Sequence, residues 1–83
     1  MVVRVAFRNS PMLYDYLCDL PVRRGDLVIV PTGPAPFREF AVVKVMEVRE
    51  HSSKATSWVA QKVDVAGFNR KVEEIEEMKM MLG

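Results

Sequence analysis

The hydrophobic period of this 83-residue chain changes at Val65, and this change is the strongest constraint on its fold. Before Val65, apolar and polar residues alternate in short runs, as in residues 2–8, which is the pattern of half-buried strands. After it, apolar residues recur at the spacing that places them on one face of an amphipathic helix. This face carries Phe68, Val72, Ile75, Met78 and Leu82.

Turn-forming residues divide the first part of the chain into five predicted strands. Asn, Ser and Pro occupy residues 9–11, Gly25 permits a positive φ, and a proline-rich loop covers residues 31–37. Met46 marks the point at which the alternation loses its phase, which indicates a β-bulge. The predicted strands cover residues 2–8, 13–19, 27–30, 40–49 and 58–64.

Five short strands followed by one helix predict a mainly β protein. The form expected for residues 1–64 is a small five-stranded antiparallel barrel, SH3-like or OB-like. Asp64 is the expected N-cap of the helix of residues 65–83. We expect this helix to pack on the barrel and to cover an open end or edge, so that the chain forms one domain.

Composition argues against several classes of site. Cys18 and His51 are the only cysteine and histidine, so we expect no intramolecular disulfide, no metal site and no cofactor. The chain shows no paired acid and base, no nucleophile with a base and no phosphate-binding glycine loop, so we expect no enzyme. No signal peptide and no bilayer-length apolar run is present, which favours a cytoplasmic protein with no membrane partner.

Basic and aromatic residues alternate with the predicted core residues of several strands. When Val3 and Val5 point inward, Arg4 and Arg8 point outward. By the same alternation, we expect the side chains of Lys44, Trp58 and Lys62 to point outward. One interpretation is a surface that binds a nucleic-acid backbone through the basic residues and stacks a base on Trp58. The other is that these are ordinary solvated strand faces and that Trp58 packs under the helix. The net charge of +1 argues against strong nucleic-acid binding.

Three short motifs carry a resemblance to a known family. They are "YDYL" at residues 14–17, "VRRGDLVIVPTG" at residues 22–33 and "FAVVKV" at residues 40–45. Residues 1–64 resemble, through these motifs, the N-terminal DNA-binding domain of the PriA replication-restart helicases. The resemblance implies a small barrel that holds the 3′ end of a DNA strand. It implies a pocket for the terminal nucleotide formed by Tyr14, Asp15 and Gly33.

The overall layout, with barrel strands and a charged terminal helix, is similar to that of small phage or prophage proteins. We therefore expect a non-catalytic binding module whose partner is single-stranded DNA or a phage or host protein. The alternative is a structural or assembly protein that forms homo-oligomers through its methionine-rich helix. The expected oligomer contacts are Ile75, Met78, Met81 and Leu82.

Overall fold

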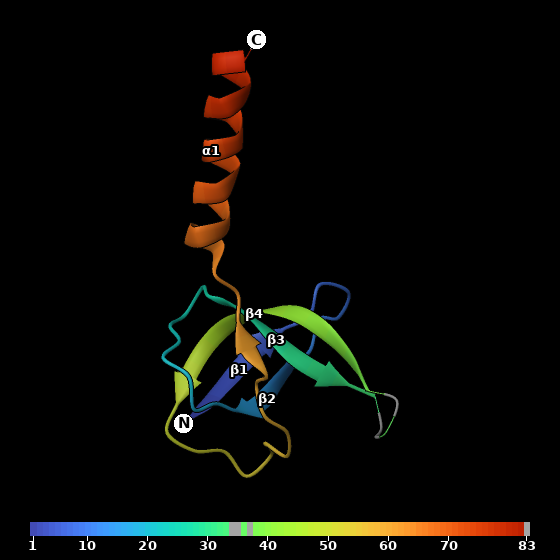
Figure 1. Cartoon of the computed structure of the whole chain (residues 1–83). Coiled ribbons are helices and arrows are strands. Elements are labelled where there is room, and N and C mark those ends of the chain that lie inside the picture. Colours follow the sequence, from blue (N-terminus) through green and yellow to red (C-terminus); the bar gives the residue numbers. More distant parts are fainter. Residues whose placement is uncertain (34–35, 37, 83) are drawn as a thin grey trace.

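A computed structural model shows a five-stranded antiparallel sheet followed by one C-terminal helix (Figure 1). The structure describes residues 1–33, 36 and 38–82, without the side chain of Leu82. Within these residues the predicted strands and the predicted helix are all present. The elements are β1 (Val2–Ala6), β2 (Leu13–Leu17), β3 (Leu27–Thr32), β4 (Glu39–Arg49), β5 (Gln61–Lys62) and α1 (Val65–Leu82).

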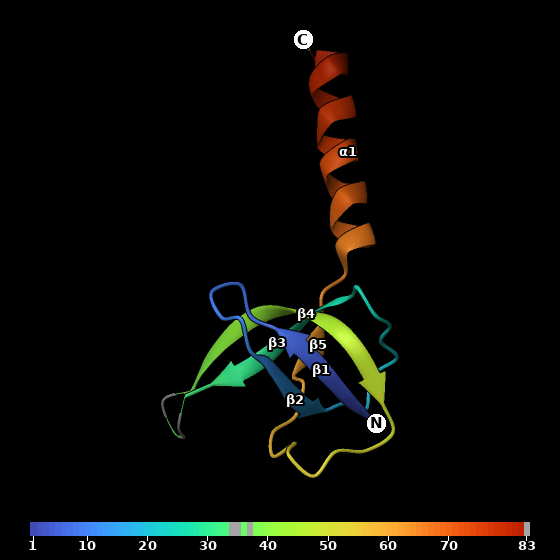
Figure 2. The same cartoon turned by 180° about the vertical axis from the view of Figure 1, so that it is seen from behind.

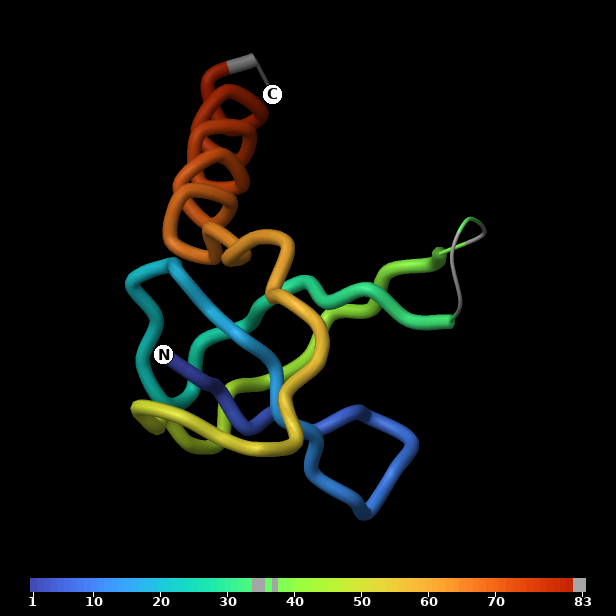
Figure 3. Tube along the Cα trace, turned by 90° about the horizontal axis from the view of Figure 1, so that it is seen from below, coloured from blue at the N-terminus to red at the C-terminus, as the bar shows by residue number. Residues whose placement is uncertain are grey.

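The strands follow the order β2-β1-β4-β3-β5, and the ladder does not close on itself. The sheet is strongly curved, so that its strands surround a common interior (Figure 3). One short bridge joins β2 to the segment that leads into β5. The Leu17 N–H donates to the Ser57 carbonyl, and the Val59 N–H donates to the Leu17 carbonyl, each over 2.8 Å.

The bend in β4 comes from a bulge at the predicted position. Arg4 of β1 pairs with Glu47 and the next residue, Val5, pairs with Val45, so Met46 is the extra residue of β4. A bulge adds local twist and bends the strand. The prediction drawn from the lost alternation near Met46 is therefore confirmed.

Valines form most of the core inside the curved sheet. Val45 and Val5, which face each other across β4 and β1, are completely buried. Cys18 is buried among them as a free thiol, as a small core residue. The core cluster consists of Val3, Val5, Cys18, Val22, Val28, Val30, Val43, Val45 and Val59.

All five strands differ from their predicted bounds. β1 and β2 each end two residues early and β4 begins one residue early, whereas β3 and β5 differ for identifiable reasons. β3 continues through Pro31 and Thr32, which pair with β4. The missing N–H of Pro31 is tolerated because β5 pairs only with Val28 and Ile29, so no strand lies beside Pro31 on the β5 side to accept a hydrogen bond from it. The rest of the predicted loop lies partly outside the described residues. β5 is short because its segment changes partner, from Leu17 of β2 at Trp58 to β3 at residue 61.

The helix begins as the sequence predicts. The Asp64 side-chain Oδ1 accepts from the Gly67 N–H over 2.9 Å, and the Phe68 N–H donates to the Asp64 carbonyl over 3.1 Å. These contacts satisfy donors that a helix N-terminus otherwise leaves free, so Asp64 is the N-cap.

The position of α1 corrects the expectation that it packs on the barrel. The helix stands away from the sheet in both views (Figures 1 and 2), and the molecule measures 56 × 29 × 24 Å. Its apolar residues are exposed, including Phe68 at 66% and Ile75 at 53%. The strands and loops of the curved sheet already bury its inner face, so the helix is not needed to cover these core valines.

Candidate functional site

An open hollow lies at one end of the curved sheet, between the β1–β2 turn, the end of β3 and the start of β4. The β1–β2 turn and these ends of β3 and β4 project to the same side of the sheet (Figures 1 and 3). Its volume is about 510 Å³, and it is called the Tyr14 hollow below. Strands and turns that are distant in sequence contribute to it. Its lining consists of Phe7, Arg8, Asn9, Ser10, Tyr14, Tyr16, Pro31, Thr32, Gly33, Ala41 and Val42.

Pairing in the sheet positions the ring of Tyr14. Tyr14 of β2 lies directly opposite Val5 of β1, so its side chain leaves the sheet on the side of the buried valines. It sits at the end of the strand, where the interior opens, and it stays 42% exposed. The ring of Phe7 packs edge-on against it, with centroids 5.2 Å apart and planes at 81°. This contact orients the tyrosine without covering it.

Gly33 forms part of the opposite wall of the Tyr14 hollow. Its φ is 74°, in the left-handed region where a side chain would add strain. The residue is exposed and follows the last residue of β3. The hollow therefore contains a stretch of backbone without a side chain, which a flat ligand can approach closely.

Asp15 does not share this hollow, although the resemblance places it beside Tyr14 and Gly33. Its side chain is 4% exposed and lies opposite Arg4. The Arg4 Nε–H donates to Oδ1 over 2.9 Å, and the Ser52 hydroxyl donates to Oδ2 over 2.6 Å. The hydrogen bond from Arg4, and then that from Ser52, lower the pKa of the Asp15 carboxyl below its ordinary value. Asp15 thus joins the loop of residues 50–57 to the sheet, and the predicted three-residue pocket is corrected to Tyr14 and Gly33.

The predicted outward basic and aromatic residues also separate into different places. Arg4 is held by Asp15, and the Lys62 ammonium lies 3.4 Å from the Asp26 carboxylate. Trp58 is exposed beside β2, where its backbone bridges Leu17. Arg8 and Lys44 line a shallow hollow on the outer face of β1, β3 and β4. These residues do not form one continuous binding surface.

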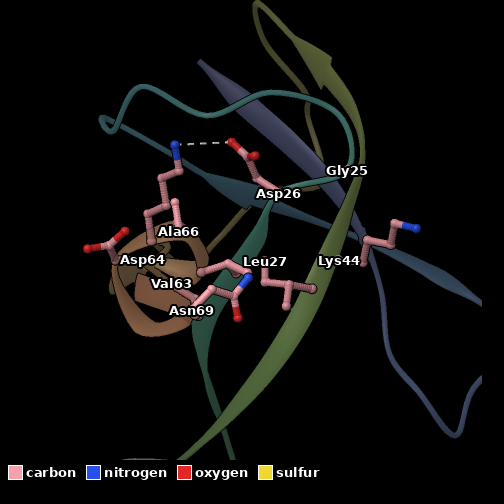
Figure 4. A pocket seen from close by; sticks show the side chains of 10 residues that line it. Gly25, Asp26, Leu27, Lys44, Val63, Asp64, Ala66 and Asn69 are labelled. Atoms are coloured by element: carbon pink, nitrogen blue, oxygen red, sulfur yellow. Dashed lines mark ion pairs between the residues drawn. The ribbon is translucent and has the colours of Figure 1, made fainter. Parts of the chain in front are cut away.

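A second hollow, of about 790 Å³, lies at the base of the helix (Figure 4). It extends from Gly25 and Leu27 to Asn69, and three of its four charged side chains, all except Lys44, form hydrogen bonds or ion pairs with described residues. Asp26 accepts from the Arg23 N–H over 2.8 Å and pairs with Lys62. The hydrogen bond from Arg23, with the charge of Lys62, lowers the pKa of the Asp26 carboxyl. These contacts hold the turn before β3 against the segment before the helix.

The Tyr14 hollow differs from this second hollow in its chemistry. Among the described residues that line it, Arg8 carries the only charge, and Arg8 forms no ion pair with the part of the chain that the structure describes. Two tyrosines and a phenylalanine supply ring surface beside this cation. Burial raises the pKa of Tyr16, which packs against the core and forms the floor of the hollow. The site therefore suits a flat ring that carries a negative charge.

The sequence analysis did not place Phe7 or Ser52 at a functional position. Phe7 continues the alternation that turns Val3 and Val5 inward, and this alternation together with the turn at residues 9–11 is enough to bring it close to Tyr14. Nothing in the sequence indicated the bond from Ser52 to Asp15, because 37 residues separate the two along the chain.

Of the predicted oligomer contacts, Ile75, Met78 and Met81 are exposed on α1. The side chain of Leu82 lies outside the described residues. Met78 belongs to the apolar face that was expected to pack on the barrel, and it is exposed because the helix does not pack on the sheet.

Comparison with protein-family models, curated proteins and solved structures gives no match. The resemblance to the PriA domain and to small phage proteins stays a prediction. In the part of the chain that the structure describes, no helix combines the length and the apolarity needed to cross a membrane.

Proposed function

We propose that this protein is a non-catalytic binding module that holds an unpaired base of single-stranded DNA in the Tyr14 hollow. The observation that carries the proposal is the exposed ring of Tyr14, oriented by Phe7, in a hollow whose described lining carries one charge, that of Arg8. A base stacks on an aromatic ring, and an arginine pairs with a phosphate.

The architecture supports a ligand at this end of the sheet. We propose that the curved sheet, with the bridge from Leu17 to Trp58, is a partly open small barrel with the Tyr14 hollow at its mouth. Barrel mouths are frequent ligand sites, because the strands hold the walls rigidly while the end remains accessible.

The charge of the chain sets the expected strength of binding. With a net charge of +1, the protein neutralises few phosphates, so binding is weak and depends little on salt. Arg8 supplies one phosphate contact, and its loss lowers the slope of log K against log salt by about 0.7 for a single strand.

The proposal does not include recognition of the 3′ hydroxyl by Asp15. Both carboxylate oxygens already accept hydrogen bonds, and the side chain is almost fully buried. We therefore expect similar affinities for strands with a free and with a blocked 3′ end.

The test is a titration of a fluorescently labelled single-stranded oligonucleotide, followed by anisotropy at two salt concentrations. Tyr14→Ala removes the stacking surface and should weaken binding by about 1–3 kcal/mol, or roughly 5- to 150-fold. Tyr14→Phe keeps the ring and should stay within about twofold of the parent.

Trp58→Ala is the matched control, because it removes an exposed ring from a different part of the surface. It should leave the affinity unchanged, and circular dichroism of each variant checks that the sheet is retained. Equal binding by the parent and by Tyr14→Ala would contradict the proposal. So would a lack of binding to any single strand, or a clear preference for the free 3′ end.

A further inference from the structure

A stripe of exposed apolar residues runs along α1. It shares no residue with the Tyr14 hollow, so an inference about it is independent of the proposed DNA binding. Val65, Phe68, Val72 and Ile75 are all exposed, at spacings of three and four residues. An isolated helix of 18 residues is only marginally stable in water, so a stripe of this kind needs a surface that buries it.

The spacing matches the inner positions of a two-stranded coiled coil. Val65 and Val72 occupy the a positions, and Phe68 and Ile75 occupy the d positions between and after them. Lys79 occupies the next a position. A single polar residue at a favours one alignment of the two helices, and it lowers the stability of the coiled coil. Valine at a is the choice of two-stranded coiled coils that have leucine at d, whereas here Phe68 and Ile75 occupy d.

The flanking charges distinguish between the two possible directions of a second helix. In a parallel pair, position g of one helix faces position e of the next heptad of its partner. These positions are Lys71 and Glu76, so each parallel pair gains two contacts between opposite charges. In an antiparallel pair, Lys71 would face Met78 and Glu76 would face Asn69, with no complementary charge.

We propose that two copies of this chain associate through α1 as a short parallel coiled coil. In this dimer the valines, Phe68 and Ile75 form the seam, and Lys71 pairs with Glu76 of the partner subunit. Met78 flanks the seam, and Met81 lies outside it. The remaining acidic residues of the helix face water, and the two sheets with their Tyr14 hollows remain accessible. Because the seam covers little more than two heptads, the dimer is weak.

The first test measures the mass of the intact protein by sedimentation equilibrium, between about 10 µM and about 1 mM. We expect a reversible monomer–dimer equilibrium. Ile75→Glu should weaken association at least about tenfold, because it places a charge in the seam. Glu77→Lys, on the opposite face, is the control for a changed charge. Lys71→Glu should weaken association, and adding Glu76→Lys should restore it.

The second test distinguishes the direction of the helices. Cys18 is buried, so a new cysteine on α1 is the accessible thiol. Lys79→Cys places two thiols next to each other across a parallel seam, within the distance that a disulfide spans. We expect rapid formation of a disulfide-linked dimer on mild oxidation. Glu77→Cys, which points away from the seam, is the matched control and should link slowly.

Three outcomes would overturn the proposal. The first is a protein that remains monomeric at about 1 mM. The second is association that Ile75→Glu does not change. The third is a disulfide that forms no faster in Lys79→Cys than in Glu77→Cys, which would exclude the parallel direction.

Discussion

The curved sheet and the helix both carry regularly spaced apolar residues, yet the sheet buries them and the helix exposes them. Val45 of β4 is fully buried, whereas Ile75 of α1 is 53% exposed. The sheet satisfies its own apolar face because it curves around it, aided by the bulge at Met46. A single straight helix cannot do this, so its stripe must be covered by something else.

This difference teaches that periodicity identifies an apolar face but not the surface that covers it. The expectation that α1 covers the sheet came from the usual rule that an apolar helix face packs on its own domain. In this protein the strands and loops of the sheet bury its inner face without the helix. We therefore assign the stripe to a second copy of the chain, on the charge pattern of Lys71 and Glu76.

A matched pair of substitutions gives the largest expected difference between the two regions. Val45→Ala removes two buried methyl groups and should lower the free energy of unfolding by about 2–3 kcal/mol. Val72→Ala removes the same groups from the exposed helix, where alanine is also the better helix former. It should change the free energy of unfolding by less than about 0.5 kcal/mol.

Urea denaturation at low protein concentration, where the dimer dissociates, measures both values. Equal destabilisation by the two variants would mean that the helix packs on the sheet in solution. The contrast between a buried sheet core and an exposed helix would then not hold.

Asp15 should give a smaller effect, confined to the sheet. Asp15→Asn weakens the bonds from Arg4 and Ser52 and should lower the free energy of unfolding by about 1–2 kcal/mol at neutral pH. The pKa of Asp15 is lowered in the folded state, so the ionised form stabilises folding. This stabilisation is fully present above the pKa of the unfolded chain, near about 4, and is lost as the pH falls through the folded pKa.

The difference between the parent and Asp15→Asn should therefore shrink as the pH falls below about 4. Asp19→Asn is the control, since Asp19 is exposed on the same segment. A difference that stayed constant down to about pH 2 would show that the charge of Asp15 is not responsible.

Most of the fold could be predicted from local patterns. Alternation located four strands closely, the loss of phase located the bulge at Met46, and the change of period located the helix with Asp64 as its cap. The fifth strand was predicted too long, because the change of partner near Trp58 depends on the tertiary arrangement and has no local signal. The position of the helix was missed for the same reason.

The candidate site could be predicted only in part. Tyr14 and Gly33 line one hollow, and both residues were named from the resemblance. Alternation alone could have excluded Asp15, because adjacent residues of a strand point to opposite sides. Its hydrogen bond from Ser52 has no local signal, because Ser52 lies in a distant loop. The outward basic residues were identified by alternation, but alternation does not reveal that Arg4 and Lys62 are held in ion pairs.

Hydrogen exchange of backbone amides at two protein concentrations tests the central claim most directly, because it reports on both regions in one sample. We predict that amides of β1, β3 and β4 are strongly protected at either concentration, since the sheet core is complete within one chain. Amides of α1 should exchange rapidly in dilute protein and become protected as the dimer forms. Helix amides that are protected as well as the sheet in dilute protein, or that do not respond to concentration, would contradict the account.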